Sequence, residues 1–343
     1  MDSGWVRFSE GAAEPPSAAE AALAAAASDC HGDPAPVIAL LRTGTLPSIG
    51  SGLSPLRGNA ERWWRLLATL ASLDLTAARA VEPHLDALTI LDQAGIVPEP
   101  GTVWGVFAAE SPDTKLVAVD DGRWRLEGTK PWCSLAGQID RAIVTAHVDG
   151  GRRAFAVDLR LPQVRVAEAH WHSRGLRQVP SGPVHFDGAP AEPVGAAGWY
   201  LQRPGFAAGG IGVAACWFGG AVGLYRSLHS AALRREPDQL ALAWLGEADR
   251  LLAGAAALLA DAARRADGGT ATWIHAHRVR GQVEALCRRI LDISGQAGGP
   301  RPLAFDEDHA RRVADLGLYI RQHHAARDDA ALGRLLLEED RPW

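Results

Sequence analysis

A tryptophan, a cysteine and a serine stand in a row at positions 132–134, at the end of the run L-E-G-T-K-P-W-C-S. An indole is a rigid flat wall that packs well against a planar ring system. Ser134 comes two residues after Trp132, so in an extended backbone its hydroxyl points the same way as the indole and can bond the edge of such a ring. The run predicts either a contact strand for a flat, ring-shaped cofactor or an ordinary strand with a core tryptophan.

Two histidine pairs have a spacing that suits metal ligands on an extended strand: His170 with His172, and His275 with His277. Neither pair has a neighbouring cysteine or a convincing carboxylate partner to complete a ligand set. We interpret these residues as surface or packed histidines and predict that the protein holds no metal ion.

The elements that must position these residues change in type along the chain. Up to about residue 100 the apolar side chains follow helical spacing, which predicts helices over residues 60–73 and 85–95. From residue 103 the pattern changes to short strand-like runs separated by turn residues, with a turn at Gly128. This spacing suits a small antiparallel barrel or sandwich. The expected strands cover residues 115–119, 123–126, 141–148, 153–159, 164–167 and 184–186.

Helical spacing returns from residue 206, and two apolar stripes predict the inner faces of a helical bundle. Along the first stripe the side chains recur every seven residues, and along the second they step by four and three. The first contains Trp244, Leu251 and Leu258 with Ala248, Ala255 and Ala262 between them, and the second contains Val279, Val283, Leu286, Ile290 and Ile293. The order predicts an α+β multidomain chain with domains at residues 1–101, 102–195 and 196–343.

Composition excludes several classes of protein. The formal net charge is −5, which argues against a nucleic-acid-binding surface. The four cysteines are far apart in the sequence and form no C-x-x-C motif, as expected for free thiols in the reducing cytoplasm. No apolar run is expected to reach membrane-spanning length. We therefore expect a cytoplasmic protein with no membrane span and no nucleic-acid partner.

Four motifs, in their order along the chain, resemble the acyl-CoA dehydrogenase family. Residues 126–134 are similar to its flavin-contact strand, Gly-x-Lys-x-Trp-(Ile/Cys)-(Thr/Ser). Residues 103–112, V-W-G-V-F-A-A-E-S-P, resemble a strand that ends in Thr-Glu-Pro, although Ala109 and Ser111 replace the Thr and the Pro. Residues 171–188 resemble the family's Gly-x-Arg-x-(Ser/Thr) turn and closing strand, and residues 203–224 its first C-terminal helix. The resemblance implies an N-terminal helical domain, a middle antiparallel β-barrel and a C-terminal helical bundle.

The resemblance also implies an FAD cofactor between the barrel and the bundle. Carried over by position, Trp132, Cys133 and Ser134 belong to the flavin-binding strand. Ala108 and Ala109 offer backbone groups at the edge of the ring.

In this family a neighbouring subunit usually contributes an arginine to the pyrophosphate and a glycine-rich turn near the adenine. The best matches are Arg234, with Arg235 as its alternative, and Gly295 in the run S-G-Q-A-G-G. The resemblance therefore implies a homodimer or a homotetramer.

The resemblance breaks at the catalytic base. Dehydrogenases of this family take the proton α to a thioester with a glutamate from a Tyr-Glu-Gly-Thr turn, whose pKa is raised. In residues 314–324 this glutamate falls on or beside Arg321, which cannot accept a proton near neutral pH. His323 continues an inward-facing apolar stripe, and is either an acid/base group beside the flavin or a core histidine. Arg321 and His323 are the catalytic residues that we predict.

We expect an FAD-dependent oxidoreductase that dehydrogenates an acyl thioester at its α and β carbons with a non-standard base. Its partners would be a small-molecule or acyl-thioester substrate and an electron-transfer flavoprotein. Two alternatives remain open at this point: a flavin-dependent monooxygenase on the same fold, and a non-catalytic relative that uses the same groove for binding.

Overall fold

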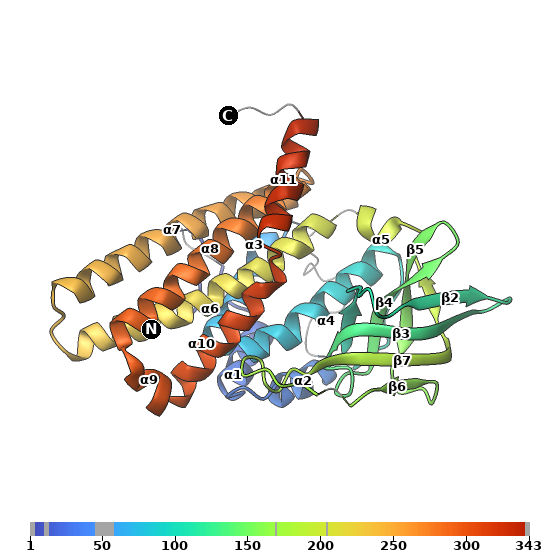
Figure 1. Cartoon of the computed structure of the whole chain (residues 1–343), viewed down its shortest axis with the longest axis horizontal. Helices are drawn as coiled ribbons and strands as arrows, with labels where there is room; N and C mark the ends of the chain where they lie inside the picture. The colour runs from blue at the N-terminus through green and yellow to red at the C-terminus, as the bar shows by residue number, and fades with distance from the viewer. Residues whose placement is uncertain (1–3, 10–13, 45–57, 169, 204, 340–343) are drawn as a thin grey trace.

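A computed structural model describes residues 4–9, 14–44, 58–168, 170–203 and 205–339. Helices occupy one side of the molecule and a single sheet the other (Figure 1). The first four helices are α1 (Ala18–Ser28), α2 (Ala35–Arg42), α3 (Ala60–Leu73) and α4 (Leu75–Gln93).

The helix expected over residues 60–73 is confirmed as α3, but the one expected over residues 85–95 is only the second half of α4. The earlier start of α4 is set by Asp74, whose carboxylate accepts hydrogen bonds from the backbone N–H groups of Thr76 and Ala77. Pro83 lies inside this helix and hides its continuity in the sequence.

The middle of the chain forms an eight-stranded sheet. Its main path runs β6-β7-β3-β2-β4-β5-β8, and β1 pairs with β4. Most pairings are antiparallel, as expected, but β1 and β2 each pair with β4 in parallel. The strands are β1 (Trp104–Phe107), β2 (Leu116–Asp120), β3 (Trp124–Ser134), β4 (Arg141–Val148), β5 (Gly151–Asp158), β6 (Val164–Val166), β7 (Ser181–Pro190) and β8 (Glu192–Val194).

The turn predicted at Gly128 is wrong, because β3 continues through this residue to Ser134. Gly128 has φ +112°, and a Cβ atom there would lie 2.3 Å from the carbonyl oxygen of Lys115 on the neighbouring strand segment. The glycine therefore permits a local irregularity inside a long strand.

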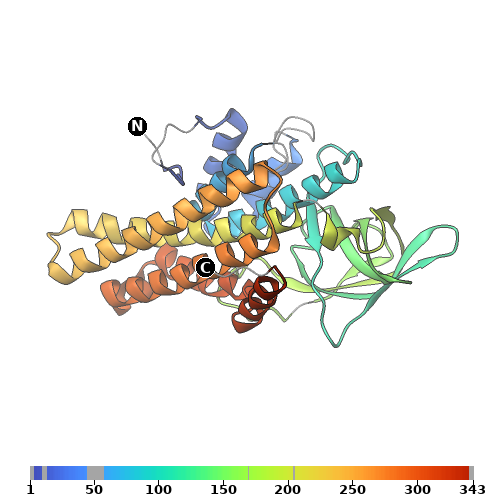
Figure 2. The same cartoon turned by 90° about the horizontal axis from the view of Figure 1, so that it is seen from above.

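Most of the remaining helices form an elongated bundle that extends away from the sheet (Figure 2). They are α6 (Phe206–Arg234), α7 (Gln239–Asp267), α8 (Trp273–Gly298), α9 (Pro300–Phe305), α10 (Glu307–Tyr319) and α11 (Ala326–Glu338), with a short 3₁₀ turn at Ile320–Gln322. The short helix α5 (Trp199–Gln202) lies instead beside β5 of the sheet (Figure 1).

The stripe predicted on α8 is confirmed, since all five of its residues are buried. On α7 the alanines Ala248, Ala255 and Ala262 are buried, whereas Trp244, Leu251 and Leu258 are only partly buried. The inner face of α7 thus consists of these alanines together with Leu252 and Leu259, which are also buried, and not of Trp244, Leu251 and Leu258. Small residues there let α7 approach its neighbours closely.

Helix α6 is long and apolar enough to cross a membrane by length and composition, so the expectation that no run reaches this length is wrong. In the folded chain 78% of that apolar stretch is buried. Its glycines allow close packing: a Cβ atom on Gly219 would lie 2.1 Å from the carbonyl oxygen of Ala68 on α3.

Helix α4 is tied to the sheet by His84. Its Nδ1 accepts a hydrogen bond of 3.1 Å from the backbone N–H of Trp104 on β1. Burial lowers the pKa of His84 to about 4, so the imidazole is neutral and can act as this acceptor. The contact fixes the face of α4 that carries Arg79 and Glu82 relative to the end of β3.

Candidate flavin site

Trp132 presents an exposed indole at the end of β3. Its side chain lies in an irregular part of the strand, where the pairing with β7 shifts register between Lys130 and Cys133. The residue has φ +58°, which is unusual for a bulky side chain, and it is 60% exposed. Such backbone strain clusters at active sites, ligand clamps and switch regions. The prediction that the backbone is extended at this residue is wrong.

The residues on either side of Cys133 are nevertheless more accessible than Cys133 itself. Cys133 is buried, and burial raises the pKa of its thiol to about 12. Ser134 is half-buried, and its Oγ lies 2.7 Å from Ser181 Oγ on β7. The end of β3 thus offers a flat indole and a hydroxyl, while its thiol points into the core.

Arg79 on α4 links Ser134 to a carboxyl group that the sequence analysis did not single out. Its Nη2 donates a hydrogen bond of 2.9 Å to Ser134 Oγ, and its Nη1 lies 3.7 Å from Glu82 Oε2. The guanidinium carbon is 5.8 Å from the centre of the Tyr319 ring on α10. Arg79 Nη1 is buried without a hydrogen bond, whereas the Tyr319 hydroxyl lies against the Cys216 thiol. A buried donor without an acceptor is costly, and such donors are found where a ligand or a water molecule binds.

Glu82 is in a poorly solvated position one helical turn from Arg79. Burial raises the pKa of this carboxyl to about 7; the charges of Arg79 and Arg280 oppose the shift, and the charge of Asp86 adds to it. The sequence contains a pattern that could have indicated this cluster, because positions 79, 82 and 86 lie on one face of a helix. We missed it because an i, i+3 ion pair is typical of any solvated helix surface.

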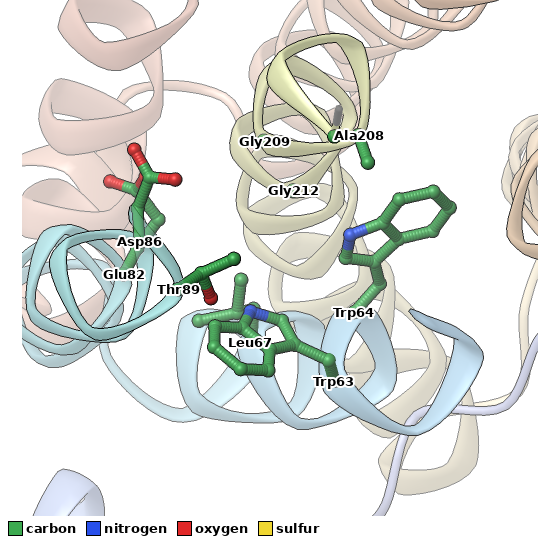
Figure 3. A pocket seen from close by; sticks show the side chains of 10 residues that line it. Trp63, Trp64, Leu67, Glu82, Asp86, Thr89, Ala208, Gly209 and Gly212 are labelled. Atoms are coloured by element: carbon green, nitrogen blue, oxygen red, sulfur yellow. The ribbon is translucent and has the colours of Figure 1, made fainter. Parts of the chain in front are cut away.

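A small cavity of about 20 Å³ lies beside Glu82, and Figure 3 shows the side chains around it. Glu82 and Asp86 approach it from α4, Trp63 and Trp64 from α3, and a glycine-rich face from α6. A cavity of this size has room for one water molecule, and the two carboxyl groups provide polar partners for it.

The loop after β1 is held to β3 through an ion pair. Ala108 and Ala109, half-buried and exposed, follow β1, and the next residue is Glu110. Glu110 Oε1 accepts a hydrogen bond of 2.7 Å from the ammonium group of Lys130, which lies only two residues before Trp132. This bond brings the two expected flavin-contact segments together on the sheet. Burial lowers the pKa of Lys130, and Glu110 opposes that effect.

The two predicted catalytic residues lie beyond this cluster. Arg321 is exposed, and its Nε donates to the carbonyl oxygen of Gly317. His323 is buried, as its stripe predicts; its Nδ1 accepts from Ala325 N, and its Nε2 is 3.7 Å from Asp328 Oδ2. Arg280 on α8 bonds the carbonyl oxygens of Gln322 and Gly210, and so stands between this turn and the start of α6.

The residues expected to bind the adenine end of FAD lie at the end of the bundle that is farther from the sheet. Arg234 lines a groove of about 710 Å³ together with Ser294 and Gly298, and Gly295 is an exposed residue on the same turn of α8. Helix α6 has 29 residues, so about 42 Å separates its first residue, Phe206, from Arg234. The structure brings Arg234 and the glycine-rich turn together, but places them far from Trp132 of the same chain.

The two histidine pairs show no metal-site geometry. The rings of His170 and His172 are stacked 6.1 Å apart, and His275 Nδ1 accepts from Thr272 N at the start of α8. Within the described residues, no cluster of three or more histidine, cysteine or acidic side chains could hold a metal ion.

Comparison with known proteins gives two results. Residues 96–189 match the family model of the acyl-CoA dehydrogenase middle domain. A sequence search of curated proteins gives no match.

Solved structures match along nearly the whole chain. KijD3, in complex with FMN and dTDP-3-amino-2,3,6-trideoxy-4-keto-3-methyl-D-glucose, is 20% identical with a TM-score of 0.78, and 96% of each chain is covered. Butyryl-CoA dehydrogenase from Megasphaera elsdenii is 17% identical with a TM-score of 0.77, covering 95% of this chain and all of that one. Dibenzothiophene monooxygenase TdsC from Paenibacillus sp. A11-2 is 20% identical with a TM-score of 0.74, covering 94% and 97%. At these identities the matches show the fold.

Proposed function

Because this chain belongs to an acyl-CoA dehydrogenase-like family, we propose that it is an FAD-dependent oxidoreductase. The observation that carries the proposal is the exposed, strained Trp132 beside Ser134, whose hydroxyl reaches the partly unsatisfied guanidinium of Arg79. An indole face, a hydroxyl and an arginine with a free N–H suit a flat ring whose edge carries hydrogen-bonding atoms. FAD would supply the capacity to accept a hydride, and the chain's own residues would bind and orient it.

The reaction that we propose first is dehydrogenation of an acyl thioester at its α and β carbons, with an electron-transfer flavoprotein as the electron acceptor. A carboxyl group with a pKa near neutrality beside the predicted flavin strand supports this choice, because such a group can take up and release a proton. His323 remains a second candidate for proton transfer. Arg321 would hold an anionic group only from the surface of the molecule.

A monooxygenase is the alternative, supported by the likeness to TdsC and to the FMN complex of KijD3. An absorbance spectrum of the purified protein separates the two. FAD that stays bound through purification, with no consumption of oxygen, supports the dehydrogenase. Flavin that binds only when reduced supports the monooxygenase. Protein that binds neither oxidised nor reduced FAD would refute both.

Substitution of Trp132 tests the flavin contact directly. Trp132→Ala is expected to weaken FAD binding by about 1–3 kcal/mol, or roughly 5- to 150-fold, because one face of the ring loses its aromatic neighbour. Fluorescence titration with FAD would measure the change. Trp199→Ala, which removes a partly buried indole on α5, is the control and should leave affinity within about twofold. Equal effects of the two changes would rule out a specific role for Trp132.

We also propose a homodimer or a dimer of dimers, in which one copy completes the FAD site of another. The end of the bundle that carries Arg234 also exposes Leu233, Leu240 and Phe305, the last at 86%. Exposed apolar groups around a groove are typical of surfaces that bind a partner. A second copy that covered them would bring its Arg234 and Gly295 to the adenine end of the first.

A site shared between two copies predicts that a substitution far from the flavin ring changes the affinity for FAD. Arg234→Gln should reduce FAD affinity about tenfold or more, since it removes a charged partner of the pyrophosphate. Arg264→Gln, at an exposed position on α7, should not change the affinity. Light scattering at micromolar concentration gives the oligomeric state. A monomer that binds FAD with unchanged affinity after Arg234→Gln would disprove the shared site.

A further inference from the structure

Glu82 is enclosed by charged and titratable groups from five helices, and this enclosure sets its chemistry. These groups are Arg79 and Asp86 on α4, Tyr200 on α5, Cys216 on α6, Arg280 on α8 and Tyr319 on α10. Arg79 is the nearest of the cations, at 3.7 Å, and its other nitrogen is bonded to Ser134. The carboxyl group is therefore one guanidinium away from the hydroxyl that marks the predicted flavin edge.

The ion pair between Arg79 and Glu82 lacks a full set of hydrogen bonds. Arg79 Nη1 and Glu82 Oε2 are too far apart for a good hydrogen bond, and Nη1 is buried with no other acceptor. A purely structural ion pair in a buried position normally satisfies its donors. A loosely held ion pair with an unused donor is better suited to a carboxyl group that gains and loses a proton and changes its hydrogen-bond partner.

The carboxyl group also meets solvent, since the side chain of Glu82 is 12% exposed and that of Asp86 is 21% exposed. Glu82 and Asp86 share the water-sized cavity of Figure 3, and Asp86 lies one turn further along α4 towards the start of α6. Asp86 is itself held by Arg203, at 3.1 Å. A water molecule between the two carboxyl groups would allow a proton to leave Glu82 without passing through the flavin site.

We propose that Glu82, held by Arg79 against Ser134, is the acid–base group of this site, and that it exchanges its proton with solvent through the cavity shared with Asp86. The inference rests on the proposed function. In the dehydrogenation, a Glu82 oxygen forms an O–H bond as the α C–H bond of the substrate breaks. The electron pair of that bond becomes the new carbon–carbon double bond as a hydride leaves the β carbon, and FAD, when bound, would supply the acceptor for this hydride. Arg79 is a positioning residue, which acts by holding the carboxylate.

The first experiment follows the carboxyl band of the protein by infrared spectroscopy between pH 5 and pH 9. A protonated carboxyl group with a midpoint about pH 7 should be present in the wild type, absent from Glu82→Gln and retained by Glu82→Asp. Glu247→Gln is the matched control, because Glu247 also pairs with an arginine, Arg289 at 2.7 Å, but lies on α7. Burial also raises the pKa of Asp315 to about 6, so the Glu82 signal is read from the difference between the wild type and Glu82→Gln. A difference spectrum with no component that titrates near pH 7 would overturn the inference.

The role of Arg79 can be tested by the midpoint of the same infrared titration. Its positive charge lowers the pKa of Glu82, so Arg79→Gln should move the midpoint to higher pH, and Arg79→Lys should bring it back. An unchanged midpoint in Arg79→Gln would remove Arg79 from the proposal.

The pH dependence of stability gives a second readout that needs no flavin. Folded Glu82 keeps its proton up to about pH 7, whereas a glutamate in the unfolded chain loses it near its model value of 4.5. The folded state therefore binds more protons within this window, and Glu82 makes the free energy of unfolding fall as the pH rises through it. This contribution should be absent from Glu82→Gln and present in Glu247→Gln.

With FAD bound, the flavin midpoint potential should be measured against pH. The reduced flavin itself ionises close to neutral pH, so the variants are compared with one another. A slope near pH 7 that is shared by the wild type and Glu247→Gln, and that differs in Glu82→Gln, is expected if Glu82 exchanges protons with the redox site. Equal slopes in wild-type and Glu82→Gln protein that both carry FAD would overturn the inference alone. Failure to bind FAD would instead refute the proposed function, so the two failures are distinguishable.

Discussion

Replacing Gly219 by alanine is expected to destabilise the protein by about 3 kcal/mol or more, at the upper end of the range for overpacking. Gly219 lies at the crossing of α6 with α3, and an added Cβ would stand 2.1 Å from the carbonyl oxygen of Ala68 and 2.7 Å from its Cα. These are backbone atoms, so no side chain can turn away to make room. The two helices would have to separate along their shared face. Chemical denaturation followed by circular dichroism measures the loss.

The chain provides a matched control on α7. Gly254→Ala adds the same methyl group to a long helix, but nothing lies within 4 Å of the new Cβ. It should therefore stabilise the protein by about 0.5–1 kcal/mol through the better helix propensity of alanine. If the two variants were equally stable, the α3–α6 contact would be looser than the structure indicates.

Removing the carboxylate of Glu110 should be nearly as costly. Lys130 is 1% exposed, and in Glu110→Ala its ammonium group would keep only the hydroxyl of Thr145, at 3.0 Å. An uncompensated buried charge costs about 3–5 kcal/mol. Because burial lowers the pKa of Lys130, the unfolded state holds this proton more tightly. The deficit should therefore shrink as the pH approaches the usual pKa of lysine.

A double substitution separates this effect from a general weakening of the sheet. Lys130→Met combined with Glu110→Ala removes both charges and should recover most of the loss, because a buried ion pair is often no better than an apolar replacement. Glu127→Ala, at an exposed position on β3, should change stability by less than about 0.5 kcal/mol. A double variant as unstable as Glu110→Ala would show that the carboxylate has another essential partner.

Local patterns predicted the elements well wherever one face of a helix is buried. The four-and-three steps of Val279, Val283 and Leu286 identify α8 because each side chain on that face meets the bundle. The same logic was incomplete on α7, where the predicted alanines are buried together with Leu252 and Leu259, while Trp244 is only partly buried. Periodicity finds an amphipathic face, but the choice between small and large residues at its centre depends on the neighbouring helix.

The candidate site was only half predictable. Trp132 and Ser134 were found because they are close in sequence, and family resemblance gave their order a meaning. Arg79 and Glu82 were not found, because their roles depend on contacts with Ser134 and Tyr319, which lie 55 and more than 200 positions away. A carboxylate acquires a raised pKa only from its surroundings. No pattern within one helix contains that information.

The four cysteines can be used to measure local opening of the structure. Each is a free, buried thiol, and they lie in four places: the connection between α1 and α2 (Cys30), β3 of the sheet (Cys133), α6 (Cys216) and α8 (Cys287). Thiol reagents attack only accessible thiolates, so modification of each site has to wait for its region to open. The rates of modification, resolved by mass spectrometry, would therefore give four separate opening free energies from the unaltered chain. They would show whether the sheet and the bundle unfold together or one before the other.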